Sequence, residues 1–112
     1  MLPRKYRLGK NKNFSRVFKD GSFTKGKIIS LKKFNNNLLF ARVGFVVGQK
    51  VAKKSVDRVK VKRRLSSIIE RLVGEINDGV DVIILPTSDV VSQKYEEIEK
   101  ELRDLLKKAK IL

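Results

Sequence analysis

The amino-acid sequence predicts a small α+β protein with a single hydrophobic core. Its 112 residues are enough for one domain and too few for two. Apolar residues recur at helical spacing in three segments, and β-branched or aromatic runs separate those segments. We therefore expect one unit spanning residues 1–112, with helices packed on a mixed central sheet.

The N-terminal part predicts a basic arm followed by a short helix. Residues 1–10 combine cations with Pro and Gly and hold few large apolar groups, which is typical of irregular chain. In the next ten residues, Phe14, Val17 and Phe18 fall at i, i+3 and i+4, and Gly21 stands where a helix would end. This spacing predicts a helix with one apolar face.

Two strand-like runs follow, at residues 23–34 and 38–47, with a third short strand possible near residues 24–28. The two runs flank Asn35-Asn36-Asn37, and Asn tolerates the left-handed backbone of tight turns. We therefore expect an antiparallel hairpin. Alternation assigns one core-facing side of its second strand to Leu39, Ala41, Val43, Phe45 and Val47.

The second half predicts a long helix, a strand and a final helix. Ser55 is expected to cap the long helix. Its buried stripe is predicted to be Val61, Leu65, Ile68, Ile69, Leu72, Val73 and Ile76. Residues 77–79 break the helix, "VDVIIL" at 80–85 is an apolar strand, and a helix from about Tyr95 follows. The order read from the residues is αββαβα, to which the short strand near residues 24–28 would add one.

The charge is distributed unevenly along the chain. Residues 1–64 hold 20 Lys or Arg and two acids, whereas residues 65–112 hold 7 Lys or Arg and 10 acids. The stretch "KKSVDRVKVKRRL" at 53–65 holds seven cations and one acid. Such crowding at a helix start favours a phosphate-bearing partner, because the helix dipole and free N–H groups attract the same anion. The alternative is a basic face that is merely solvated.

The composition excludes several kinds of chemistry. The sequence has no Cys and no His, so it offers no disulfide, no thiolate nucleophile and no imidazole base. We expect no catalytic side chain and no metal site in the protein itself. The carboxylates of the last helix fit a solvated face. No apolar run reaches the roughly 20 residues of a membrane span, and an uncleaved, cytoplasmic protein is expected.

Phe14 and Phe18 allow two interpretations. As neighbours at i and i+4 they suit a core, yet aromatic rings among cations also stack the bases of single-stranded nucleic acid. A ring packed on one side and open on the other would serve both.

Taken together, the basic arm, "FSRVFKDGS" (14–22), "RVGFVVGQKV" (42–51) and "KKSVDRVKVKRRL" (53–65) resemble the protein subunit of bacterial ribonuclease P over nearly the whole chain. The resemblance implies an αβββαβα sandwich with a left-handed βαβ crossover. It also implies that a large catalytic RNA holds Mg²⁺ together with its substrate and removes the 5′ leader of precursor tRNA, assisted by the protein.

The resemblance also assigns residues to two surfaces. Contacts to the catalytic RNA fall on Lys50, Lys53, Lys54, Arg58, Lys60, Lys62 and Arg63. The leader-binding cleft falls on Phe14, Phe18, Ser30 and Lys32. The family's Arg-Asn-Arg signature is Arg58-Val59-Lys60 here, a basic residue common in the family is Ser66, and an aromatic residue often found near Lys32 is missing.

The hypothesis is thus a protein whose two surfaces bind two RNAs. One alternative is a ribosomal or other structural RNA-binding protein, which the composition would suit equally well. A self-sufficient nuclease with metal on acidic residues is disfavoured by the scarcity of acids in the basic half. A helix-turn-helix protein is disfavoured because the basic helix follows a strand.

Overall fold

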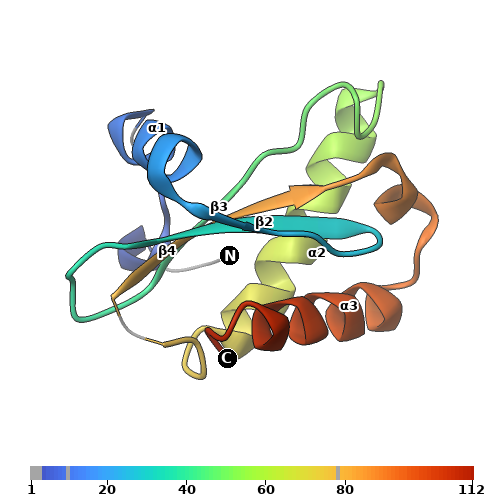
Figure 1. The fold of residues 1–112 in the computed structure, drawn as a ribbon. Coiled ribbons are helices and arrows are strands. Elements are labelled where there is room, and N and C mark those ends of the chain that lie inside the picture. The colour runs from blue at the N-terminus through green and yellow to red at the C-terminus, as the bar shows by residue number, and fades with distance from the viewer. Residues whose placement is uncertain (1–3, 10, 78) are drawn as a thin grey trace.

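The computed structural model describes residues 4–9, 11–77 and 79–112 (Figure 1). Its helices and strands follow the predicted order αβββαβα, with two short 3₁₀-helices, η1 and η2, in addition. In chain order the elements are η1 (Arg4–Tyr6), α1 (Asn11–Asp20), β1 (Ser22–Thr24), β2 (Ile29–Asn35), β3 (Arg42–Phe45), α2 (Ser55–Leu72), β4 (Val80–Pro86), η2 (Ser88–Ser92) and α3 (Tyr95–Lys108).

The strands form one mixed sheet in the order β1-β2-β4-β3. β1 and β2 are antiparallel, as are β2 and β4, whereas β3 and β4 are parallel and are joined through α2. Figure 1 shows α1 on one face of the sheet and α3 on the other. The predicted α+β sandwich is confirmed, and the left hand of the β3-α2-β4 crossover stays a prediction.

The predicted hairpin between residues 23–34 and 38–47 is wrong. β4 lies between β2 and β3, pairing Ile84 with Leu31 on one side and Val82 with Val43 on the other. The physical reason is that β4 is apolar on both faces, with residues 80–84 all buried, so it needs a central position. Asn37 does adopt the left-handed backbone, at φ 59°, but in a loop that crosses the end of the sheet.

The main core lies between the sheet and the pair α2 and α3. It buries the predicted stripe of α2, apart from Val73, which is half-buried. The side chain of Leu39 is 90% exposed, which corrects its assignment to the core, because β3 begins only at Arg42 and Leu39 lies in the loop. The expected cap is also wrong: Lys54 occupies the N-cap position of α2, and its side chain makes no capping hydrogen bond.

The arm predicted at residues 1–10 is only partly irregular. Residues 4–6 form η1, Arg7 bridges to Val43, and the Leu8 N–H donates to the Val43 carbonyl at 3.0 Å. The Leu8 side chain is buried, and it joins Val17 and Ile83 in a second, smaller cluster on the α1 face of the sheet. Residues 4–8 therefore cover the outer edge of β3, while residues 1–3 and 10 lie outside the described part.

One buried ion pair holds the start of β3 against β4. The carboxylate of Asp81, whose side chain is 2% exposed, accepts hydrogen bonds from Arg42 Nε at 2.8 Å and from Arg42 Nη2 at 2.7 Å. Asn36 Nδ2 donates to the same carboxylate at 2.7 Å. The hydrogen bond to Asp81 raises the pKa of Arg42 above its ordinary value. The network fixes the β2–β3 loop to the sheet.

Candidate RNA interface

The predicted contacts to the catalytic RNA gather around the start of α2. We call Lys50, Lys53, Lys54, Arg58, Lys60, Lys62 and Arg63 the basic collar. All of them are exposed except Arg58, which is half-buried. They lie on the loop before α2 and on its first three turns, at the upper right of Figure 1. The structure thus brings the predicted residues together on one end of the molecule.

Arg58 has a structural role within the collar. Its Nη1 donates to the Ala52 carbonyl at 3.0 Å and to the Lys53 carbonyl at 2.7 Å. These bonds hold the loop before α2 against the first turn of the helix. Arg64, six residues further along α2, is half-buried, and its Nη1 donates to the Gln93 carbonyl at 3.5 Å. The exposed cations therefore lie on a helix start that these hydrogen bonds hold in place.

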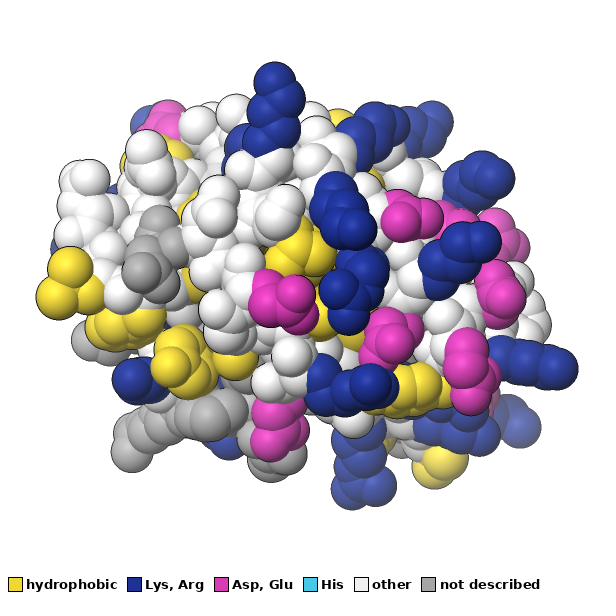
Figure 2. Space-filling view, turned by 90° about the horizontal axis from the view of Figure 1, so that it is seen from below, with side chains coloured by type: hydrophobic (Ala, Val, Ile, Leu, Met, Phe, Trp, Pro, Cys, Tyr) yellow, Lys and Arg dark blue, Asp and Glu magenta, His cyan; other side chains and the backbone are white. Residues whose placement is uncertain are grey.

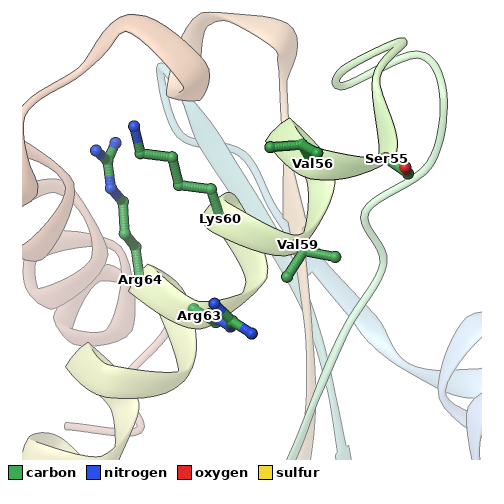
Figure 3. A pocket seen from close by; sticks show the side chains of 6 residues that line it. All are labelled: Ser55, Val56, Val59, Lys60, Arg63 and Arg64. Atoms are coloured by element: carbon green, nitrogen blue, oxygen red, sulfur yellow. The ribbon is translucent and has the colours of Figure 1, made fainter.

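A shallow, open depression of about 510 Å³, which we call the hollow, lies along one face of α2 beside the collar cations (Figure 3). It is lined by Ser55, Val56, Val59, Lys60, Arg63 and Arg64. Its apolar part consists of two valines, which the charge pattern alone did not single out.

The charge on the opposite side of the molecule is mixed. Seen from below, cationic and acidic side chains are interspersed over the face that includes α3 (Figure 2). Arg71 Nη1 lies 2.6 Å from Glu99 Oε1, and Arg103 Nη1 lies 3.9 Å from Glu75 Oε1. Glu99 of α3 thus pairs with Arg71 of α2, and Arg103 of α3 pairs with Glu75, which follows α2. These pairs lie on a partly solvated face and do not involve an acid–base cluster.

The residues predicted for the leader cleft lie on α1 and on the face of the sheet that α1 covers. The Phe18 ring is 39% exposed, and Lys32 Nζ lies 5.4 Å from its centroid. Lys32 Nζ also donates to the Phe18 carbonyl at 2.8 Å, which ties β2 to the last turn of α1. Ser30, two residues earlier on β2, is half-buried on the same face. A partly open aromatic ring beside a cation suits the stacking of an unpaired base.

Phe14 is less exposed than Phe18. Its ring is half-buried and packs on Gly44 of β3: a Cβ at Gly44 would come within 2.5 Å of Phe14 Cζ and 3.2 Å of Leu8 Cβ. Phe14 also packs against the small cluster of Val17 and Ile83. It therefore fixes α1 on the sheet, which is the core role that its spacing allowed.

The substitution Gly44→Ala is expected to destabilise the fold by about 1–3 kcal/mol, because the added methyl group would displace the Phe14 ring from its packed position. Urea unfolding measures this. Gly48→Ala is the matched control, since a Cβ there meets no atom within 4 Å. Equal stability of the two variants would contradict the close packing of Phe14 on β3.

Further apolar residues on the same side of the sheet were not predicted as a site. Phe23 is 56% exposed and is the register partner of Lys32, and Val46 is 38% exposed just after β3. Leu85, paired with Ser30, is half-buried. Placing Phe23 and Leu85 beside Lys32 and Ser30 required the pairing of β2 with β1 and β4.

Two further kinds of feature, a metal site and a membrane-spanning helix, are absent from the described residues. In that part of the chain, no three His, Cys, Asp or Glu residues gather where they could hold a metal ion. Within it, no helix has the length and apolarity needed to cross a membrane.

A family model for ribonuclease P matches residues 2–110. The chain belongs to the ribonuclease P protein family. It is 34% identical to the ribonuclease P protein component of Pseudanabaena sp. (strain PCC 6903) over 113 residues, covering 100% of this chain and 97% of the relative. It is 35% identical to the ribonuclease P protein component of Alkaliphilus oremlandii (strain OhILAs) over 106 residues, covering 95% and 92%.

Solved structures of ribonuclease P proteins share the fold. The chain superposes on a mutant Staphylococcus aureus RNase P protein, described as defective in mRNA degradation activity, with a TM-score of 0.90 at 25% identity, covering 97% of this chain and 92% of that one. For the Thermotoga maritima RNase P protein the TM-score is 0.83 at 26% identity, covering 91% and 96%. The chain is thus an RNA-binding protein component of a tRNA-processing ribonuclease P, and a ribosomal protein is not favoured.

Proposed function

We propose that the chain docks on the catalytic RNA of ribonuclease P through the basic collar and holds the 5′ leader of precursor tRNA in the cleft of Phe18, Lys32 and Ser30. The observation that carries the proposal is the difference between these two surfaces. The collar is a cluster of exposed cations, suited to the phosphates of a folded RNA. The cleft joins an exposed ring to a cation and suits a single strand.

Hydrolysis is assigned to the RNA partner. The resemblance implies Mg²⁺, and the described residues of this chain form no group of three His, Cys, Asp or Glu that could hold it. In the proposal the catalytic RNA and the substrate would hold the metal, which would supply the activation of water for hydrolysis. The protein neutralises phosphates and adds contacts to the leader. A cytoplasmic location stays a prediction.

Cleavage of precursor tRNA by a bacterial ribonuclease P RNA tests the proposal at low Mg²⁺. Addition of the chain is expected to raise the rate, because cations on the collar replace part of the Mg²⁺ needed to bring two polyanions together. Binding to the RNA without stimulation would favour a purely structural role. Cleavage by the purified chain alone would instead indicate a self-sufficient nuclease.

The leader contact is tested separately, by measuring the binding of precursor tRNA and of mature tRNA. Phe18→Ala is expected to weaken binding of precursor tRNA by about 1–3 kcal/mol, the usual contribution of one stacked base. Binding of mature tRNA, which has no leader, should not change. Leu39→Ala, which removes a 90% exposed side chain outside the cleft, is the control. An equal loss of affinity for precursor and mature tRNA would show that Phe18 does not contact the leader.

A further inference from the structure

The hollow on α2 has an apolar lining that phosphate binding does not use. Val56 is 74% exposed and Val59 is 47% exposed. They stand at i and i+3, so both side chains lie on the same face of the helix. Exposed β-branched residues in a helix carry a propensity cost and gain nothing from burial. Their presence among the collar cations indicates a contact with something apolar.

Cations follow the valine pair along the helix. In Figure 3 the side chains of Lys60 and Arg64 extend in the same direction, while Arg63 points a different way, one turn after Val59. The hydrogen bond from Arg64 to the Gln93 carbonyl steadies the Arg64 side of the hollow against the end of η2. An occupant must therefore present an apolar surface to the valines and negative charge at its rim.

We propose that this hollow takes an unpaired nucleobase of the catalytic RNA, with one face of the base on Val56 and Val59 and its flanking phosphates on Lys60 and Arg63. A nucleotide has both features, since its base has apolar faces and its backbone is anionic. The inference rests on the proposed function and adds to it a base contact among the collar's phosphate contacts. RNA is favoured over an acidic protein segment because the hollow lies beside the collar cations.

The double substitution Val56→Ala/Val59→Ala tests the base contact. Affinity for a bacterial ribonuclease P RNA is expected to fall about three- to tenfold, from the apolar area lost. The slope of log K against log salt should stay unchanged, because no phosphate contact is removed. Ala favours helix more than Val, so weaker binding would not reflect a loosened helix. Inorganic polyphosphate, which has the charge and lacks bases, should bind the variant and the wild type equally.

Leu39→Ala is the control, because it removes an exposed apolar side chain from the β2–β3 loop, away from α2. Unchanged RNA affinity of the valine variant would overturn the inference, and so would an equal loss for RNA and polyphosphate. A wild-type chain that fails to bind the RNA would overturn the proposed function, and this inference with it. Wild-type binding that the valine variant fully retains would overturn the base contact alone.

Discussion

Replacing Lys60, Lys62 and Arg63 together by glutamine is expected to weaken binding to the catalytic RNA about a hundredfold. All three side chains are exposed on the first turns of α2. Each phosphate contact of an exposed cation contributes about 1 kcal/mol. Each also releases counterions, so the salt slope of log K should fall by about 2 to 3. Titration of labelled RNA at several salt concentrations measures the affinity and the slope together.

The matched control removes the same number of charges elsewhere. Lys94, Lys100 and Lys107 are exposed on or beside α3, where acids and cations are interspersed (Figure 2). Their replacement by glutamine lowers the net charge equally and should leave the salt slope nearly unchanged. If both triple variants lose affinity and slope alike, net charge and not the collar binds the RNA.

Arg58 is left out of the triple variant for a structural reason. Its guanidinium donates to the Ala52 and Lys53 carbonyls, so Arg58→Ala would loosen the loop that carries the other collar lysines. A loss of RNA affinity in that variant would mix a missing contact with a disturbed surface. The exposed cations give the cleaner measurement.

The helices could be predicted from the sequence because their signals are local. The stripe from Val61 to Leu72 repeats at helical spacing over several turns, and the structure buries that stripe in the core. The cations on the outward faces of the same helix follow from the same geometry. The position of the collar was therefore available from the sequence.

The strand pairing could not be predicted from the same kind of signal. Proximity along the chain favoured a hairpin, whereas the parallel pairing of β3 with β4 depends on where α2 returns the chain. The one local clue was the composition of β4, which is apolar on both faces and therefore central. Residues that enter the cleft through that pairing, such as Leu85, were missed for the same reason.

The different roles of Phe14 and Phe18 also could not be predicted from the sequence and required the three-dimensional structure. Their spacing puts both on one side of α1, yet Phe14 packs on Gly44 while Phe18 remains partly open beside Lys32. The two rings differ because Gly44 of β3 has no Cβ, which leaves room for the Phe14 ring to pack there. No pattern within α1 carries that information.

The substitution Arg42→Met is expected to destabilise the fold by about 3–5 kcal/mol, because it leaves the Asp81 carboxylate buried without its charged partner. A domain of this size has a total stability on the order of 5–15 kcal/mol, so the loss would be a large part of it. Met keeps the length and most of the packing of the side chain. Urea unfolding at neutral pH measures the difference.

Two further variants separate the lost pair from other effects. Arg71→Met breaks the ion pair between Arg71, whose side chain is 62% exposed, and Glu99, whose side chain is 24% exposed. This variant should change the free energy of unfolding far less, because water reaches both groups. Adding Asp81→Asn to Arg42→Met should restore part of the loss, since a neutral amide is cheaper to bury than an unpaired carboxylate. If Arg42→Met unfolds at the same urea concentration as Arg71→Met, then the Asp81 carboxylate is solvated in the folded protein, and the pairing of β3 with β4 does not depend on this ion pair.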